Sequence, residues 1–274
     1  MEIALSAQER SDETLSPTHL EQALSAIRDD GFVVLEDIIA HDHLDQLRER
    51  MDEDSRRLIA AERWGGAGGL PGHLQQGAPP FAPFVFGDIV ANPFVIQVSR
   101  AILGDGFFNS FYSGNSNCPG SGTQPLHRDS DHLWPGLPVA HPPPRLVVNI
   151  SPHDVSEENG SVELWPGTHL DTSVGSVPDA DEEAARRAVV PPVRGNARKG
   201  SALIRDMRVW HRGVPNQSDR PRHMIAMIHT IHWLNQGNPL TFGEGCEAAF
   251  TESALDHNVA FTDEPIDYLG LGKG

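Results

Sequence analysis

Apolar residues recur at helical spacing near the start of the chain. Three of them fall on one face of the same predicted helix: Leu20, Leu24 and Ile27. Thr18 and Glu21 have the spacing of a capping box, and Gly31 follows as a typical stop signal. We therefore predict a helix that begins after Thr18 and ends before Gly31.

Two further helices and one strand are predicted in the next part of the chain. Residues 41–61 carry an apolar stripe along one face, and residues 92–104 open with Asn-Pro and close on Gly, so both segments predict helices. The run "FVVL" between the first two helices predicts a short strand. Residues 64–83 are rich in Gly and Pro and predict a long loop, of a kind that is often functional inside a compact domain.

The pattern then changes to short β-type runs separated by clusters of turn residues. The runs are "FFNSFYS", "RLVVNIS", "SVELWPG", "SALIRD" and "HMIAMIHTIHW". Short strands at this spacing are typical of an antiparallel sandwich or barrel. Trp165 and Trp210 are expected in its core, because aromatic residues on strands usually pack.

A single domain is the simplest organisation for this pattern. Residues 171–199 interrupt the strands with a short predicted helix, "DADEEAARRA", and the weakly patterned segment after Leu234 is expected to follow the surface. We expect the following parts within one domain over 1–274: a helical part over about 1–105, a β core over about 106–234 and a C-terminal extension over 235–274.

Composition and charge narrow the choice of compartment and partner. The chain has 21 basic and 38 acidic residues, a formal net charge of −17, which disfavours binding to nucleic acid or anionic membranes. No stretch has the roughly 18 apolar residues of a membrane span, and the first residues lack a secretory signal pattern. Cys118 and Cys246 have no CxxC partner, which favours a reducing compartment. We therefore expect a cytoplasmic protein that binds neither nucleic acid nor membrane.

The candidate chemistry is concentrated in "QPLHRDSDHLWPG", residues 124–136. His127 and Asp129 are two positions apart, so on an extended chain both side chains point to the same face and could bind one ion. The same spacing occurs at His43/Asp45 and at His169/Asp171. The first of these pairs lies in a predicted helix, where a spacing of two separates side chains around the axis, and the second is expected in a turn.

His211 and Arg222 favour the pair in residues 124–136. They flank a turn, "GVPNQSD", between two strand-like runs, so both side chains could face one cavity. Two histidines and one carboxylate with open positions are the signature of non-haem Fe(II) oxygenases, and an arginine fork suits a carboxylate ligand. The residues alone leave a second interpretation equally open, in which these are surface or core histidines among the 14 of the chain.

The order of these motifs resembles the phytanoyl-CoA dioxygenase family of Fe(II)/2-oxoglutarate oxygenases. The resemblance extends from about Gly31 to His229 and includes "DGFVVLEDII", "LHRD", "ENGSVELWPGTH" and "RDMRVWHRGVPNQSDRPR". It implies a mainly β fold with flanking helices around a double-stranded β-helix, the jelly-roll or cupin-like core. The iron ligands that it implies are His127, Asp129 and His211. Arg222, eleven positions after the distal histidine, would bind the far carboxylate of 2-oxoglutarate.

The resemblance implies that Fe(II), 2-oxoglutarate and O2 together oxidise a C–H bond of a small molecule. Thr168 and Gln124 are further candidates for the 2-oxoglutarate pocket. The family often has a polar residue two positions after the distal histidine, where this chain has Gly213, so we expect Thr168 to supply that contact. Related halogenases have Gly or Ala at the position of Asp129, which disfavours halogenation.

More narrowly, "YSGNSNCPGSGTQPLHRDSDHLWPG" and "WHRGVPN" resemble the bacterial kanamycin B dioxygenase branch, which oxidises an aminoglycoside. Together with the net charge, this favours a cationic amino sugar and a role in antibiotic biosynthesis. Substrate contacts are expected from the loop 64–83 and the acidic insert 171–199. The individual residues expected to bind substrate are Asp131, His132 and Trp134.

Three alternatives remain at this stage. The same oxygenase chemistry could act on a terpenoid or another small carboxylate. The same ligands could hold Zn(II) or Ni(II) in a non-oxidative hydrolase or isomerase, although such an enzyme has no need of Arg222. The chain could also be a metal-binding module, but a closed structural zinc site needs a fourth ligand, and no Cys or clear fourth His accompanies the other three.

Overall fold

The computed structural model describes residues 1–251 and 253–272. Its elements are β1 (Glu2–Ala4), α1 (Ala7–Asp12), α2 (Pro17–Asp29), β2 (Phe32–Glu36), α3 (His41–Ala60), η1 (Ala67–Gly69), β3 (His73–Gln75), α4 (Gly87–Val90), α5 (Pro93–Leu103), β4 (Phe108–Asn117), β5 (Arg145–Ile150), β6 (Glu163–Leu164), η2 (Thr168–Leu170), α6 (Ala180–Val189), β7 (Val193–Arg194), β8 (Ala202–Asp206), β9 (His211–Arg212), β10 (Arg222–Thr230), β11 (Leu240–Gly243), η3 (Glu247–Ala249) and β12 (Val259–Thr262).

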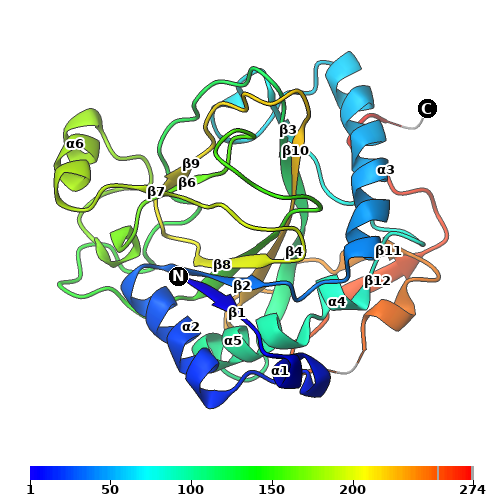
Figure 1. Ribbon diagram of the computed structural model, residues 1–274, viewed down its shortest axis with the longest axis horizontal. Coiled ribbons are helices and arrows are strands. Elements are labelled where there is room, and N and C mark those ends of the chain that lie inside the picture. The colour runs from blue at the N-terminus through cyan, green and yellow to red at the C-terminus, as the bar shows by residue number, and fades with distance from the viewer. Residues whose placement is uncertain (252, 273–274) are drawn as a thin grey trace.

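Two β-sheets form the centre of the molecule, with helices outside them (Figure 1). Seven strands form the large sheet in the order β1-β2-β8-β5-β10-β4-β3, and the small sheet has the order β7-β6-β9. All neighbouring strands in these sheets are antiparallel except β1 and β2, which are parallel. The sheet-rich centre with flanking helices is consistent with the predicted jelly-roll core.

The large sheet presents two different faces, because side chains alternate along each strand. On β10, Ile225 and Met227 point to the hydrophobic core, whereas Met224 and Ala226 line a cavity on the opposite face. The neighbouring strand β5 follows the same rule. Its core residues are Leu146, Val148 and Ile150, and its cavity residues are Val147 and Asn149. The cavity thus lies on the side of the sheet that faces away from the main core.

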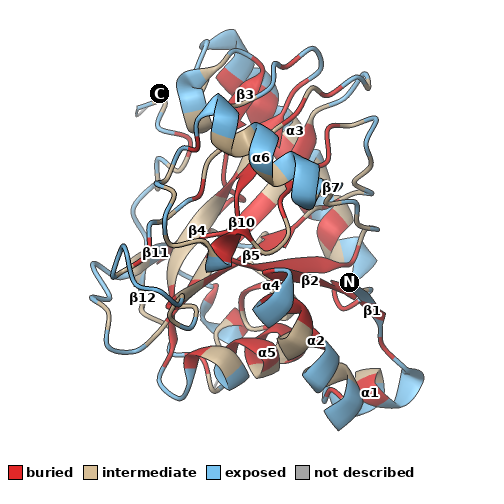
Figure 2. Ribbon diagram, turned by 90° about the vertical axis from the view of Figure 1, so that its left-hand side faces the viewer, coloured by how far each residue is buried: buried red, intermediate tan, exposed pale blue. Residues whose placement is uncertain are grey.

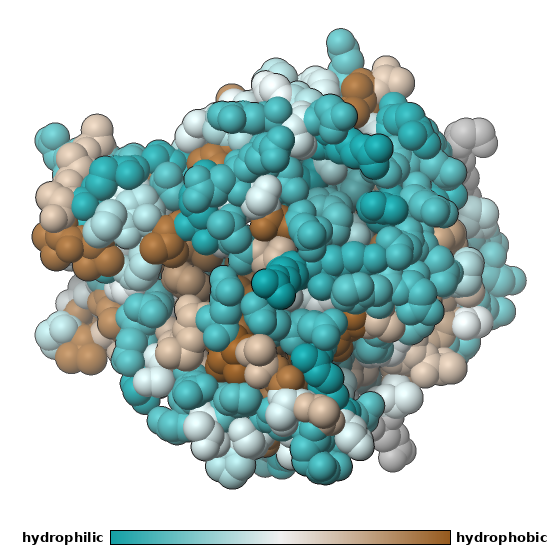
Figure 3. Space-filling view, viewed as in Figure 1, coloured by the Kyte–Doolittle hydropathy of each residue, from teal (hydrophilic) through white to brown (hydrophobic). Residues whose placement is uncertain are grey.

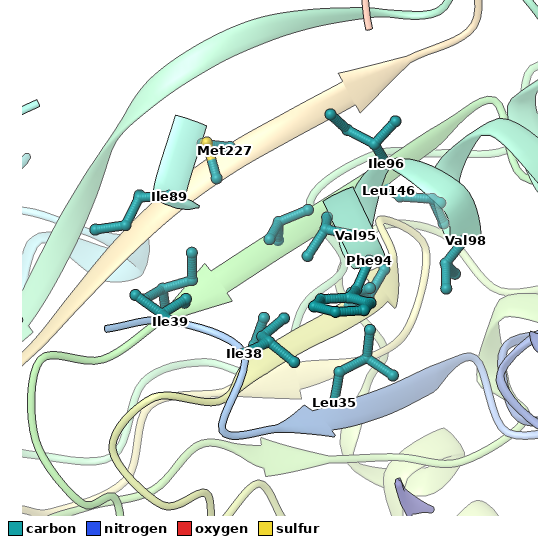
Figure 4. Packing of buried hydrophobic residues seen from close by; sticks show 14 of the residues in the cluster. Leu35, Ile38, Ile39, Ile89, Phe94, Val95, Ile96, Val98, Leu146 and Met227 are labelled. Carbon is teal, nitrogen blue, oxygen red and sulfur yellow. The ribbon is translucent and has the colours of Figure 1, made fainter. Parts of the chain in front are cut away.

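Helices α2, α3 and α5 cover the core face of the large sheet. Helix α5 buries Phe94, Val95 and Val98, which pack with Leu35 of β2 and Leu146 of β5 (Figure 4). Buried residues are accordingly concentrated in the strands and on the inner sides of these helices, whereas α6 is largely exposed (Figure 2). The two tryptophans expected in the core, Trp165 and Trp210, are fully buried.

The first predicted helix begins earlier than its apolar pattern indicates. The N-cap of α2 is Ser16, whose side chain accepts a hydrogen bond from the His19 backbone N–H at 3.2 Å, and Pro17 is the first helical residue. The capping box predicted at Thr18 and Glu21 is therefore wrong, because Thr18 already lies inside the helix. Pro17 with Ser16 before it indicates the start of this helix more strongly than Thr18 and Glu21 do.

Two segments predicted to be irregular contain strands. The loop over residues 64–83 includes β3, which pairs with β4, and the C-terminal segment contains the parallel pair of β11 and β12. Most of the surface in the view of Figure 3 is hydrophilic, with apolar residues in small groups. No helix among the residues that the structure describes is long and apolar enough to cross a membrane.

The cap of α2 gives a direct test of the corrected helix boundary. Ser16→Ala should lower the free energy of unfolding by about 1 kcal/mol, because the His19 N–H loses its partner. Thr18→Ala, at an exposed position inside the helix, should leave it nearly unchanged. Denaturant unfolding of both variants measures the difference. A larger loss of unfolding free energy in Thr18→Ala than in Ser16→Ala would instead support a helix that begins after Thr18.

Candidate metal centre and active site

The structure brings His127, Asp129 and His211 into one group. Potential ligand atoms of the three residues all lie within 4.8 Å of one another. Asp129 Oδ1 is 3.7 Å from His127 Nε2, and Asp129 Oδ2 is 3.5 Å from His211 Nε2. The backbone sets this arrangement, since His127 and His211 form an antiparallel bridge in which each N–H donates to the other's carbonyl. Residues 84 positions apart in sequence are thereby held side by side.

Hydrogen bonds orient both imidazole rings for metal binding. His127 Nδ1 lies 2.8 Å from the Pro125 carbonyl, and His211 Nδ1 lies 3.0 Å from the Val209 carbonyl. Each Nδ1–H therefore donates to backbone, and each Nε2 keeps its lone pair toward the centre of the group. Histidines that bind a metal commonly donate their other ring N–H to a backbone carbonyl in this way.

The electrostatics of the group also suit a divalent cation. Burial and the charge of Arg205 lower the pKa of His211 to about 3, so the ring is neutral at physiological pH, as a ligand must be. Burial opposes the charge on Asp129, but the charge of Arg205 and its hydrogen bond to the carboxylate outweigh this effect and hold the pKa of Asp129 below its usual range. No other His, Cys, Asp or Glu among the described residues belongs to the group. Two imidazoles and one carboxylate therefore fit a metal that keeps open positions.

The three residues open into a cavity of about 340 Å³ between the two sheets. Strands β4, β5, β8, β9 and β10 all contribute to its wall, together with residues 66–67 and 73–75. Its apolar part includes Phe111, Val147, Val162, Met224, Ala226 and Ile228. A small organic molecule could therefore bind next to the metal group, against a wall that offers both apolar and polar contacts.

Arg222 lies in the wall of the same cavity, at the first position of β10. Its side chain is buried and makes one hydrogen bond, from Nη2 to the Gly160 carbonyl at 3.3 Å. Nε has no partner among the described residues. Burial lowers the pKa of Arg222 to about 10, so the group is still charged at neutral pH. A buried guanidinium with unused donors is suited to bind a carboxylate.

Sequence comparison adds the observation that decides the family. The sequence pattern of the phytanoyl-CoA dioxygenase (PhyH) family matches residues 27–224.

The chain belongs to the phytanoyl-CoA dioxygenase family. It is therefore a dioxygenase, as the order of its motifs predicts. Among curated relatives, dioxygenase trt7 of Aspergillus terreus is 25% identical over 78% of this chain and 73% of its own length. The iron/alpha-ketoglutarate-dependent dioxygenase ausU of Aspergillus calidoustus is 25% identical over 78% of this chain and 72% of its own length.

A solved structure shares the fold of this PhyH-family chain. The non-haem alpha-ketoglutarate-dependent carbocyclase SnoK from nogalamycin biosynthesis superimposes with a TM-score of 0.59. The match covers 80% of this chain and 85% of SnoK, at 21% sequence identity. At this level of identity the likeness concerns the fold alone.

Gln124 lies in the cavity wall, where its Oε1 accepts a hydrogen bond from the Gly213 N–H at 2.9 Å. A Cβ atom on Gly213 would lie 2.7 Å from Gln124 Oε1 and 2.9 Å from His73 Cε1. Glycine at this position therefore leaves room for two polar side chains beside the distal histidine. No sequence motif indicates His73, although it lies in the loop predicted to be functional.

Thr168 does not line the cavity, contrary to its expected role in the 2-oxoglutarate pocket. Its hydroxyl donates to the Trp165 carbonyl at 2.8 Å and accepts from the Trp210 N–H at 2.9 Å. Thr168 thus joins two buried segments of the small sheet. Because Trp210 precedes His211 in the chain, this contact helps to hold the backbone next to the metal group in place. The Thr168 hydroxyl already donates one hydrogen bond and accepts another, so it is not free to bind a ligand.

The residues expected to bind substrate also lie outside the cavity wall. His132 is buried between the Asp171 carbonyl and Arg208, while Trp134 is about half exposed and lies edge-on to His141. Asp131 is exposed and is not part of the wall. The chain turns away from the metal after Asp129, so proximity in sequence does not bring these side chains to the ligand.

The acidic insert does not cover the metal group either. Helix α6 lies at one end of the molecule (Figure 1), and its Glu183 pairs with Arg187 and Arg212 at 3.0 and 3.1 Å. No residue of 171–199 lines the cavity. Glu183 of this helix is therefore used in local ion pairs. Of the two segments expected to contact substrate, only the loop 64–83 reaches the cavity.

The other two His-x-Asp pairs have separate roles. His43 lies 2.9 Å from Asp88, and Asp45 pairs with Lys199 at 2.8 Å. His169 lies in the turn η2, as expected, but it is buried with Nε2 3.1 Å from the Arg28 carbonyl. Neither pair belongs to a metal-binding group among the described residues.

Arg205, like His73, is a cavity residue that the sequence motifs do not indicate. It lies on β8 with its side chain nearly buried, and Nη2 is 2.5 Å from Asp129 Oδ2 and 3.3 Å from His211 Nε2. The run "SALIRD" predicts a strand and gives no further indication of a site. A charged residue on the cavity face of an otherwise apolar central strand is the signal that could have identified it.

Loss of a ligand should abolish tight metal binding while the fold persists. Asp129→Ala and His211→Ala should each weaken Mn(II) binding on the order of 100-fold or more, because two donors cannot hold the ion as three do. Calorimetric titration with Mn(II) measures the change, and circular dichroism checks the fold. Asp45→Ala is the matched control and should bind as the wild type does. Unchanged affinity in both ligand variants would contradict the assignment.

Proposed function

We propose that this PhyH-family chain is a non-haem Fe(II)/2-oxoglutarate-dependent dioxygenase that oxidises a C–H bond of a small molecule in secondary metabolism. The observation that carries the proposal is the common cavity. The three metal-binding residues, with their tautomers set by backbone carbonyls, face the same 340 Å³ space as the buried Arg222. Bound Fe(II), with 2-oxoglutarate and O2, would supply the oxidising chemistry.

The residues of the chain have separate tasks in this proposal. His127, Asp129 and His211 would hold the metal, and three protein ligands would leave coordination positions for other ligands. Arg222 binds the far carboxylate of 2-oxoglutarate through charge-assisted hydrogen bonds. Gln124 and His73, beside Gly213, add polar contacts at the same wall. The apolar wall excludes water and fixes the carbon to be oxidised next to the metal.

The same geometry disfavours the two alternatives from other classes. A hydrolase or isomerase that used only the metal would gain nothing from a buried arginine with unused donors in the same cavity, and burying that charge is costly. A structural metal site would be closed by a fourth ligand, whereas the group among the described residues has three.

The cationic amino sugar expected from the sequence remains a prediction that rests on the net charge of −17 and on the narrower resemblance. Asp129 is the only carboxylate among the described residues that line the cavity. The ammonium groups of such a substrate would have to find their partners outside this space. A terpenoid or small carboxylate would meet the apolar wall and the two arginines instead.

The function is tested by anaerobic addition of Fe(II) and 2-oxoglutarate, which should give the visible band typical of this complex. Arg222→Leu should raise the 2-oxoglutarate concentration needed for the band by roughly 10- to 100-fold, because charge-assisted hydrogen bonds are lost. Titration of the band measures the change. Arg220→Leu, at an exposed position nearby, is the control. If Arg220→Leu has the larger effect, Arg222 is not the anchor, and absence of the band in the wild type would contradict the function.

A further inference from the structure

Arg205 is a second buried cation in the cavity wall. Its side chain is 6% exposed, and its one ion pair among the described residues is with Asp129. Nη1 is buried without a hydrogen-bond partner in that part of the chain. The cavity therefore contains two guanidinium groups, on β8 and β10, but only one carboxylate.

The charge balance of the loaded site shows why Arg205 needs another partner. The charges of a divalent metal, Asp129, dianionic 2-oxoglutarate and Arg222 cancel one another. Arg205 then adds one positive charge that nothing else in the described wall neutralises. A buried unbalanced charge is costly, so a ligand that neutralises it gains affinity.

Metal binding also frees part of Arg205. Without metal, Nη2 contacts both Asp129 Oδ2 and His211 Nε2. Once His211 Nε2 gives its lone pair to a metal, it can no longer accept from Arg205. The guanidinium retains Asp129 as a partner, and the Nη2 donor that faced His211 becomes free for another acceptor in the cavity.

We propose that Arg205 selects a substrate with a carboxylate, or another anionic oxygen, placed next to the metal. The proposal rests on the proposed function and specifies its substrate class. Apart from the imidazole of His73, the rest of the wall is apolar or carries amides, including Asn115, Asn149 and Gln75. The substrate is thus a small organic acid with an apolar body, and Arg205 orients that body so that one C–H bond faces the metal.

Three probes of one shape and different charge test the proposal: cyclohexanecarboxylate, cyclohexanecarboxamide and cyclohexylmethylamine. Each is titrated anaerobically into the protein with Fe(II) and 2-oxoglutarate, and binding is followed by the visible band and by calorimetry. In the wild type the carboxylate should bind roughly 10-fold or more tightly than the amide, and the ammonium ion most weakly.

Two variants and one control separate substrate selection from a structural role. Arg205→Gln should remove the preference for the carboxylate, whereas Arg205→Lys, which keeps the charge, should retain part of it. Mn(II) binding should not weaken in Arg205→Gln, since removing a cation beside the metal does not reduce the attraction for it. The affinity for 2-oxoglutarate, which Arg222 and the metal would hold, should fall less than the affinity for the carboxylate probe. Arg220→Gln, at an exposed site outside the cavity wall, should preserve the wild-type order of the probes.

Several results would overturn the proposal. These are failure of the carboxylate to bind the wild type, tightest binding of the ammonium ion, or a carboxylate preference that persists in Arg205→Gln. Loss of 2-oxoglutarate affinity in Arg205→Gln as large as the loss for the probe would assign Arg205 to the cosubstrate instead. A wild-type protein that forms no band would overturn the proposed function as well, whereas the other outcomes leave that function intact.

Discussion

The two-residue alternation along β5, β8 and β10 is the constraint on which the rest of the structure depends. One set of side chains packs against the helices, and the other set forms the cavity wall with Arg205 and Arg222. A shift of one residue in strand register would place both arginines in the hydrophobic core, where a charge without a partner is very costly. Helix packing on one face and ligand chemistry on the other are therefore fixed together.

The metal group depends on this framework through backbone contacts. Pairing of His127 with His211 joins the loop after β4 to the small sheet, and carbonyls on each side set the ring tautomers. Thr168 ties the segment before His211 to Trp165. The ligands are thus positioned by main-chain geometry, which is less mobile than long side chains, and the cavity remains free for the cosubstrate and substrate.

The order of motifs along the chain predicts part of the site, and local sequence patterns predict part of the fold. The proposed metal-binding residues and Arg222 could be selected because residues far apart in the chain occur in the order of a known family. Helix α3 followed from apolar spacing, and helix α5 from its Asn-Pro start and Gly end. Thr168 and His132 were expected in the cavity because they lie close to motif residues in sequence. Their hydrogen bonds with backbone atoms, which depend on tertiary packing, direct both side chains elsewhere. The strand pattern around Arg205 does not indicate a site, because alternation along a strand does not show which groups lie opposite a charged residue.

The central claim is that one metal ion and one 2-oxoglutarate molecule share the cavity between the sheets. A crystal structure of the protein with Mn(II) and 2-oxoglutarate, with the metal located by its anomalous scattering, tests it most directly. The account predicts an ion bound by His127, Asp129 and His211, with the far carboxylate of 2-oxoglutarate on Arg222. An ion at any other group of residues, or 2-oxoglutarate bound away from Arg222, would contradict it.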